Sequence, residues 1–226
     1  MITMLEVPNL AKMIDYTIVR ADATTNDITR ICNESVKFGF WSVCVNPCYV
    51  SLASKLLKNS NVKICSVVGF PLGANSSKIK ILEAENAINE GSNEIDMVMN
   101  IGALKSFDFD FVRKDIHGVV LGVKGLNKDA IVKVIIETGF LNREEKINAS
   151  KLTKQAGADF VKTSTAFNGS GATVNDIKLI RSVVGPYFGI KASGGIRNTA
   201  EAIDLIKAGA NRLGTSTAVQ LIEKSK

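Results

Sequence analysis

A regular repeat of short apolar runs is the feature that most limits how this chain can fold. Eight runs rich in β-branched residues occur in 226 residues, which gives one unit per roughly 28 residues. A parallel strand, its connection and a helix need about that length. The runs are Met13–Val19, Trp41–Val45, Val62–Val68, Glu94–Met99, Ala130–Ile136, Asp159–Thr163, Tyr187–Lys191 and Asn211–Gly214.

The segments between these runs carry the signals of helices. Asn142 is followed three residues later by Glu145, and Asn198 by Glu201, which is the spacing of a capping box with asparagine as the N-cap. Apolar residues recur at helical spacing within the segments, as over 81–88, so that each helix has one apolar stripe to lay on a sheet. Strands and helices therefore alternate along the whole chain.

Eight such units predict a closed (β/α)8 barrel, an α/β fold with the helices outside. The alternative is an open, doubly wound sheet, in which the first turn should carry a glycine-rich phosphate-binding motif. The first run is followed instead by Ala21-Asp22-Ala23. No linker or low-complexity segment interrupts the series, so we expect residues 1–226 to form a single domain, with a short helix before about Met13 closing the bottom of the barrel.

Composition and charge exclude several classes of protein. The chain is 46% hydrophobic and lacks the run of about 20 apolar residues that a membrane span needs. Its net charge of +6 comes from scattered basic residues, and aromatic residues make up only 6%, so we expect no nucleic-acid partner. The first fifteen residues contain Glu6 and Asp15 and no apolar core of a signal peptide, which predicts a cytoplasmic protein.

Metal and histidine chemistry have little support in the sequence. His117 is the single histidine, which excludes two-histidine zinc motifs and leaves only one residue for a serine–histidine–aspartate site. The cysteines lack the CxxC spacing of a zinc or redox site and are expected to be reduced thiols. We therefore expect no metal and no cofactor.

Polar residues near the ends of three runs are the candidate catalytic groups, because active sites of barrels lie at the carboxyl ends of the strands. Asp96 lies in the fourth run, Lys162 ends the segment Asp159-Phe160-Val161-Lys162, and Lys191 ends the segment Phe188-Gly189-Ile190-Lys191. A single strand-end lysine usually reaches solvent. Two on neighbouring strands, with a carboxylate facing the same lumen, favour a functional site, since lysine is almost never fully buried without a partner.

A lysine amine attacks a carbonyl only when it is neutral, which needs a pKa of about 7 rather than its ordinary value of about 10.4. A second ammonium about 5 Å away lowers the pKa, since at an effective dielectric constant near 20 the repulsion is on the order of 3 kcal/mol. Partial desolvation would contribute the remainder. The Lys162–Lys191 pair therefore predicts Schiff-base formation with a carbonyl substrate, followed by carbon–carbon bond making or breaking.

Two glycine-containing loops predict a phosphate site. The chain reads Ser193-Gly194-Gly195-Ile196-Arg197 after the seventh run and Gly214-Thr215-Ser216-Thr217 after the eighth, each time before a helix. Barrels often bind phosphate in these two loops through backbone N–H groups and helix N-termini.

Four segments closely resemble the deoxyribose-phosphate aldolase family, and the resemblance extends from about Leu10 to Ala218. They are Val67–Gly73 (VVGFPLG), Glu94–Val98 (EIDMV), Asp159–Thr165 (DFVKTST) and Gly189–Arg197 (GIKASGGIR). The resemblance implies a class I, metal-independent aldolase that reversibly cleaves 2-deoxy-D-ribose 5-phosphate into acetaldehyde and D-glyceraldehyde 3-phosphate. It also implies a homo-oligomer, either a dimer or a tetramer.

The resemblance assigns roles to residues at matching positions. Lys162 would form the Schiff base, Lys191 would lower its pKa and relay protons, and Asp96 would donate and accept the proton with an ordered water. The remaining assignments are to substrate binding: Gly194, Gly195, Gly214 and Ser216 around the phosphate, with Arg197 assisting, Asp15 and Thr17 supporting the substrate hydroxyls, and Cys44 lining the pocket.

The chain departs from the family pattern at three places. Ala166-Phe167 stands where many members have glycine after KTST, so that 168–171 is expected to take over part of the phosphate contact. Tyr16 occupies a position where histidine is common, and the C-terminal tyrosine of some members is absent. The alternatives are another class I Schiff-base sugar-phosphate aldolase, such as a fructose-bisphosphate or transaldolase type, or a barrel that binds a phospho-sugar without catalysis.

Overall fold

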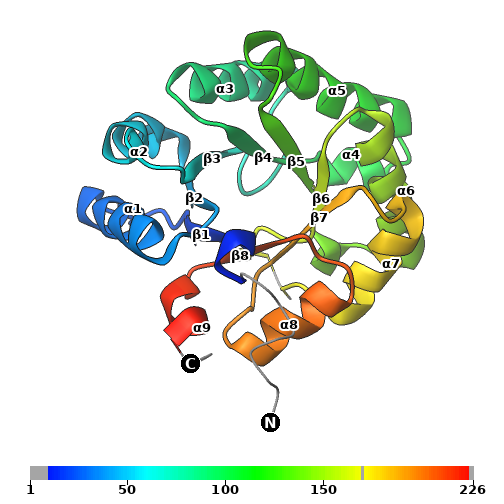
Figure 1. Ribbon diagram of the computed structural model, residues 1–226. Coiled ribbons are helices and arrows are strands. Elements are labelled where there is room, and N and C mark those ends of the chain that lie inside the picture. Colours follow the sequence, from blue (N-terminus) through cyan, green and yellow to red (C-terminus); the bar gives the residue numbers. More distant parts are fainter. Residues whose placement is uncertain (1–9, 169–170, 224–226) are drawn as a thin grey trace.

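A closed barrel of eight parallel strands forms the centre of the molecule, and helices surround it (Figure 1). The computed structural model describes residues 10–168 and 171–223. The strands are β1 (Ile14–Ile18), β2 (Ser42–Val45), β3 (Lys63–Val68), β4 (Glu94–Val98), β5 (Ile131–Ile135), β6 (Phe160–Lys162), β7 (Gly189–Ser193) and β8 (Arg212–Thr215). Each strand pairs with the next in chain order and β8 pairs with β1, so the predicted (β/α)8 barrel is confirmed.

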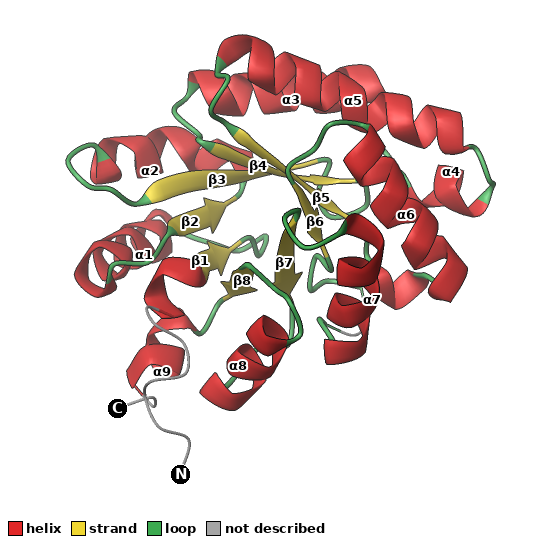
Figure 2. Ribbon diagram, turned by 45° about the vertical axis from the view of Figure 1, so that its right-hand side comes forward, coloured by secondary structure: helices red, strands yellow, loops and turns green. Residues whose placement is uncertain are grey.

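The helices follow the strands in alternation (Figure 2). The α-helices are α1 (Thr25–Phe38), α2 (Val50–Leu57), α3 (Ser77–Asn89), α4 (Ile101–Lys105), α5 (Phe109–Leu126), α6 (Arg143–Gln155), α7 (Val174–Val184), α8 (Thr199–Lys207) and α9 (Ala218–Glu223). Short 3-10 helices lie at η1 (Leu10–Met13), η2 (Pro47–Tyr49) and η3 (Thr138–Phe140). Among the described residues, no helix combines the length and the apolar character that crossing a membrane requires.

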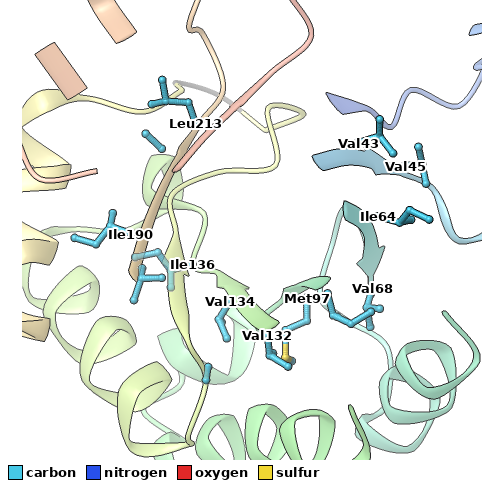
Figure 3. Close-up of a cluster of buried hydrophobic side chains, with 14 of the residues drawn as sticks. Val43, Val45, Ile64, Val68, Met97, Val132, Val134, Ile136, Ile190 and Leu213 are labelled. Carbon is cyan, nitrogen blue, oxygen red and sulfur yellow. The ribbon is translucent and has the colours of Figure 1, made fainter. Parts of the chain in front are cut away.

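The apolar core lies between the barrel and the helices. Side chains alternate along each strand, so that one set points outward to the helices and the other points into the barrel. Figure 3 shows ten labelled members of the outward set, among them Val43, Met97, Val132 and Ile190. Burying this set stabilises the fold by the hydrophobic effect. Holding the outward set against the helices also fixes which side chains point into the barrel, because the two sets alternate.

Strand boundaries agree with the predicted runs to within two residues, and one difference matters for the site. The sequence suggested that Lys191 closes its strand, which is wrong. β7 begins at Gly189 rather than at the predicted Tyr187, whose side chain is almost fully exposed. The strand continues to Ser193, which pairs with Gly214 on β8. Lys191 therefore lies in the middle of β7 with its side chain inside the barrel.

The segment before β1 is described from Leu10 onward. The predicted N-terminal helix corresponds to η1, which runs directly into the amino end of β1, and Leu10 and Ala11 pack on the main core. The rest of that prediction concerns residues 1–9, which lie outside the described residues.

Helix caps agree with the sequence signals to different degrees. Asn142 and Glu145 form the full capping box at the start of α6. Asn198 caps α8, but Glu201 accepts instead from the backbone N–H of Arg197 at 2.9 Å. Thr24 forms a further capping box at α1 that the sequence reading missed.

The Asn142 cap gives a first prediction. Asn142→Ala should lower the free energy of unfolding by about 1 kcal/mol, because the N–H of Glu145 loses its partner. Asn148→Ala, within the same helix, is the matched control and should leave the free energy unchanged or slightly raised, since alanine has the higher helix propensity. Urea denaturation of both variants measures the difference, and equal stabilities would contradict the role of the cap.

Candidate active site

A cavity of about 590 Å³ opens at the carboxyl ends of β1, β6, β7 and β8. Active sites of barrels lie at this end. Seven of the residues predicted from the sequence line it: Thr17, Lys162, Gly194, Gly195, Arg197, Gly214 and Ser216. Thr165, Phe167, Arg20 and Arg30 also line the cavity, and no motif in the sequence had pointed to the two arginines.

Asp96 joins the two predicted lysines beneath this cavity. Its Oδ2 atom accepts from the Nζ of Lys162 and from the Nζ of Lys191, each at 2.7 Å. The three side chains come from β4, β6 and β7, and strand register places Lys162 directly beside Lys191. The three predicted catalytic residues are thus brought together. The carboxylate between the two ammonium groups offsets the direct repulsion that the sequence argument relied on.

Lys191 is a fully enclosed cation. Its Nζ lies 2.5 Å from Asp15 Oδ2 as well as 2.7 Å from Asp96 Oδ2. Burial by itself lowers the pKa of Lys191, but Asp15 and Asp96 outweigh burial and raise it above its ordinary value. Lys191 is 0% exposed, whereas Lys162 is 2% exposed and reaches the cavity. Lys191 is therefore a permanent positive charge behind Lys162.

A third lysine, which the sequence reading missed, completes the surroundings of Asp96. Lys133 on β5 donates to Asp96 Oδ1 at 2.8 Å and lies 2.6 Å from Glu94 Oε2. Burial raises the pKa of Asp96, but Lys133, Lys162 and Lys191 together hold it well below its usual range. The available signal was a lysine in the centre of the run Ile131-Val132-Lys133-Val134-Ile135.

Below Lys133, a second set of ion pairs fills the barrel. Arg212 on β8 donates to Asp15 Oδ1 at 2.8 Å and to Glu94 Oε2 at 3.1 Å. Its guanidinium also lies 4.4 Å from the ring centre of Trp41, whose indole N–H donates to Glu94. The lumen of this barrel is therefore packed with paired charges at this level, rather than with branched apolar side chains.

Positive charge exceeds negative charge in this network. If every group is ionised, the charged side chains in contact around Asp96 comprise four cations and three carboxylates. Of the four cationic residues, Lys162 is the one that lines the cavity. The charged groups are Lys133, Lys162, Lys191 and Arg212, with Asp15, Glu94 and Asp96.

Two predicted substrate-binding residues lie elsewhere than expected. Cys44 does not line the cavity: β2 buries it completely, and its thiol lies 3.8 Å from Asp96 Oδ2. Asp15 is also fully buried, and its carboxylate is taken up by Lys191, Arg212 and the hydroxyl of Ser42. Asp15 lies near the amino end of β1, at the level of the ion pairs, and Cys44 points at Asp96 rather than at the cavity.

One group of residues has ligand atoms close enough to hold a metal among the described residues. Cys44, Cys65 and Asp96 have ligand atoms within 4.8 Å of one another. The Nζ of Lys133 lies 2.8 Å from Asp96 and 3.4 Å from Cys65. An ammonium group thus already occupies the place of a cation, and the group is a poor metal site.

The two glycine loops form one side of the cavity. Gly194 and Gly195 have φ values of +88° and +76°, a region that favours glycine. A Cβ on Gly214 would lie 3.0 Å from the Cε of Lys191 and 2.9 Å from the hydroxyl oxygen of Ser193. Glycine at this point leaves room beside Lys191 and exposes the backbone to the cavity.

The loop after β6 has an unusual backbone at the position where the resemblance led us to expect glycine. Ala166 has a φ of +69°, where glycine would be unstrained, and Phe167 packs edge-to-face on Phe70 with ring centres 5.2 Å apart. The predicted replacement for the phosphate contact, 168–171, includes residues 169–170, which lie outside the described residues. Asn168 lies near the carboxylate of Glu137 and acts to lower its pKa.

Comparison with known proteins decides the family. A family model described as DeoC/LacD family aldolase matches residues 10–216. This chain belongs to that family. The aldolase is thus a carbon–carbon lyase, and the resemblance inferred from its motifs is confirmed.

Individual relatives agree with this placement. The aldolase is 53% identical over 216 residues to the deoxyribose-phosphate aldolase of Thermoanaerobacter sp. (strain X514), with 96% of each chain covered. It is 54% identical over 218 residues to that of Caldanaerobacter subterraneus subsp. tengcongensis, covering 96% of this chain and 94% of the relative. The structure of deoxyribose phosphate aldolase from Aeropyrum pernix, described as a unique tetramer, matches with a TM-score of 0.89 at 34% identity, covering 96% and 90% of the two chains.

Lys133 gives a prediction about stability. Lys133→Met should lower the free energy of unfolding of the aldolase by about 3–5 kcal/mol, because Glu94 and Asp96 are left as incompletely paired buried charges. Adding Glu94→Gln should recover part of the loss. Lys80→Met, which breaks the buried Lys80–Asp115 pair outside the barrel, is the control and should show no coupling to Glu94→Gln. Chemical denaturation of the three single variants and the two double variants measures the coupling, and additive losses throughout would contradict a shared network.

The lowered pKa values of Asp15 and Asp96 give a prediction about acid unfolding. A carboxyl whose pKa is lower in the folded state stabilises the protein fully above its unfolded pKa of about 3.9, and that stability is lost as the pH falls further. The free energy of unfolding should therefore fall steeply below about pH 4. Asp96→Asn should reduce the slope by about 1.4 kcal/mol per pH unit. Equal slopes in denaturation at several pH values would contradict it.

Proposed function

We propose that the chain is a single-domain 2-deoxy-D-ribose 5-phosphate aldolase that works through a Schiff base on Lys162 and uses no metal. The reaction is the reversible cleavage of 2-deoxy-D-ribose 5-phosphate into acetaldehyde and D-glyceraldehyde 3-phosphate, as in the catabolism of deoxyribose phosphate. The observation that carries the proposal is that Lys162 alone of the three clustered lysines lines the cavity, with Asp96 and Lys191 directly behind it. The names of the relatives support the substrate.

Lys162 is the nucleophile rather than Lys191 for an electrostatic reason. Two carboxylates hold the proton of Lys191, whereas Lys162 shares one oxygen of Asp96 with Lys191. Removing a proton from Lys162 also balances the charges around Asp96. The permanent cation at Lys191 favours the neutral amine on its neighbour, which is the state that attacks a carbonyl.

The reaction then follows the chemistry of a primary amine. The Lys162 amine adds to C1 of the open-chain sugar, and the carbinolamine loses water to form an iminium ion. Deprotonation of the C3 hydroxyl lets the C2–C3 bond break, which releases D-glyceraldehyde 3-phosphate and leaves the electron pair in an enamine. Protonation of the enamine carbon and hydrolysis of the new iminium ion release acetaldehyde and restore the lysine.

Asp96 is suited to move the protons in these steps. In the resting site three ammonium groups keep it ionised. When Lys162 becomes a neutral amine or carbinolamine, one of these positive charges is lost and Asp96 accepts a proton more readily. The carboxyl can return that proton, through a water, when the carbinolamine dehydrates and when the enamine carbon is protonated.

The phosphate would bind across the two glycine loops. Gly194, Gly195, Gly214 and Ser216 border the cavity with their backbones, and the side chain of Arg197 adds a positive charge beside them. Thr17 borders the same cavity and is placed to meet a sugar hydroxyl. Asp15 acts from below by holding Lys191, and Cys44 contacts Asp96, so their part in the reaction is indirect.

The proposal extends to the assembly and location of the protein. A homo-oligomer, either a dimer or a tetramer, is supported by the tetrameric relative of Aeropyrum pernix. Four cysteines without a disulfide are typical of a reducing compartment, which supports the cytoplasm.

Trapping with borohydride tests the function. Incubation with acetaldehyde and borohydride should leave one reduced ethyl adduct on Lys162, located by peptide mass spectrometry. Deoxyribose 5-phosphate should compete, and the protein should cleave it fully in the presence of a chelator. An adduct only on Lys191 would contradict the mechanism. Efficient cleavage of another sugar phosphate, but not of deoxyribose 5-phosphate, would favour a different class I aldolase, and binding without cleavage a phospho-sugar sensor.

Lys191→Leu tests the electrostatic role within the same assay. Without the Lys191 cation, Asp96 pairs more strongly with the Lys162 ammonium, so trapping at neutral pH should slow by about tenfold or more and recover at higher pH. The pH dependence of trapping in the wild type and the variant measures this shift. Unchanged trapping at neutral pH would contradict the role of Lys191.

A further inference from the structure

The chemistry proposed above leaves one buried carboxylate at the mouth of the barrel without a use. Glu137 follows β5 by two residues and is 0% exposed. Its backbone has a φ of +52°, in the left-handed region that favours glycine. A non-glycine residue in this conformation is strained and persists only where its surroundings hold it there. We therefore ask which contacts of the Glu137 side chain compensate for this backbone strain.

The carboxylate of Glu137 accepts hydrogen bonds from the segment that follows Lys162. The backbone N–H of Thr165 donates to both Glu137 oxygens, at 3.3 and 3.2 Å, and the Thr165 hydroxyl donates to Oε2. Asn168 lies near the same carboxylate and acts to lower the pKa of Glu137. Hydrogen bonds to a charged acceptor are among the stronger ones in proteins. One side chain from the end of β5 thus holds Thr165, in the loop after β6, through both its backbone N–H and its hydroxyl.

Backbone pairing makes this grip part of a continuous connection between β5 and β6, which lie side by side in Figures 1 and 2. The N–H of Ile136 donates to the carbonyl of Lys162 at 3.0 Å, and the N–H of Thr138 donates to the carbonyl of Thr163 at 2.9 Å. Glu137 lies between these two bonds. Its side chain therefore extends the strand pairing beyond Lys162 into the loop.

The held segment forms a wall of the cavity. Thr165, Ala166 and Phe167 line the cavity together with Lys162. The N–H of Phe167 donates to the Thr165 hydroxyl at 3.1 Å, and the Phe167 ring contacts Phe70 from the loop after β3. Ala166, between them, has a positive φ of its own. The hydrogen bonds to Glu137 hold this otherwise unfavourable loop conformation in place.

We propose that Glu137 is a positioning residue of the aldolase, whose carboxylate fixes Thr165–Phe167 as the cavity wall that the sugar phosphate meets beside Lys162. The proposal rests on the proposed function for the choice of substrate. Acetaldehyde is small and needs only Lys162, so displacement of the wall should impair binding of the full substrate more than it impairs formation of the Schiff base.

Three variants separate the side chain from the backbone. Glu137→Ala removes the carboxylate. Glu137→Gln keeps one oxygen that can accept from the Thr165 N–H. Glu137→Gly relieves the backbone strain but removes the grip, so it would be fully functional if the position served only the backbone.

Asp159→Ala is the matched control, because Asp159 lies at the amino end of β6 and Glu137 holds the loop at the carboxyl end of β6. The Asp159 carboxylate accepts from the backbone N–H of Val132 at 2.8 Å and pairs with Lys124, at the amino end of β6. Asp159→Ala also removes a carboxylate and one of its hydrogen bonds to a backbone N–H, but at a residue that does not line the cavity. The control shows what a general loss of stability does to the measured quantities.

The assays are cleavage of deoxyribose 5-phosphate, borohydride trapping of acetaldehyde, and amide hydrogen exchange of the peptide spanning 163–167. In Glu137→Ala and Glu137→Gly we expect KM to rise by at least about tenfold, as for loss of hydrogen bonds to a charged group. Trapping should stay within about threefold of the wild type, and exchange should accelerate. Glu137→Gln should restore KM to within about threefold and slow the exchange again.

Several results would overturn the proposal: a wild-type KM in Glu137→Gly, no recovery in Glu137→Gln, or the same KM change in Asp159→Ala. Trapping that falls as much as cleavage would also overturn it, because the effect would then lie at Lys162 itself. If the wild type traps acetaldehyde but does not cleave deoxyribose 5-phosphate, the proposed function fails. Hydrogen exchange in the variants still tests the grip of Glu137 in that case.

Discussion

The Asp96 carboxylate, held among the ammonium groups of Lys133, Lys162 and Lys191, is the interaction on which the rest of the site depends. A buried carboxylate with no partners would take up a proton, and three unpaired lysines could not be enclosed in a barrel. Each charge is tolerable only because the others are present. The network places Lys162 and Lys191 side by side, and of these two only Lys162 lines the cavity.

The barrel provides the rigid frame that such a network needs. Eight strands bring groups from distant parts of the chain to one level, and the apolar contacts between strands and helices fix which side of each strand faces inward. Buried ion pairs are weak evidence of stability, because desolvation opposes their attraction. We therefore interpret the charged lumen as a feature kept for chemistry, with the outer apolar core supplying the stability. The hydrogen bonds between Glu137 and Thr165 connect the wall of the cavity to this rigid barrel.

Fold and catalytic residues were accessible from the sequence to different extents. The spacing of apolar runs predicted the barrel, and the polar residues near strand ends predicted Asp96, Lys162 and Lys191. Lys133 was missed because it sits inside an apolar run, where a lone lysine has no visible partner. The resemblance led us to expect Cys44 and Asp15 at the cavity, but neither lines it. The sequence could not show this, because the depth of a side chain in the barrel depends on the stagger of neighbouring strands. Glu137 carried no sequence signal, because its partners lie in a different unit of the repeat.

The sequence by itself determined the eight-unit α/β architecture and the residue types available for Schiff-base chemistry. These features follow from the periodicity of apolar residues, which depends only on residues close together in the sequence. Only the tertiary structure decided how the charges pair: that one carboxylate bridges two lysines, that a third lysine holds its other oxygen, and that Lys162 rather than Lys191 reaches the cavity. Pairing of this kind depends on strand register and depth in the barrel, which arise from contacts between residues far apart in the chain.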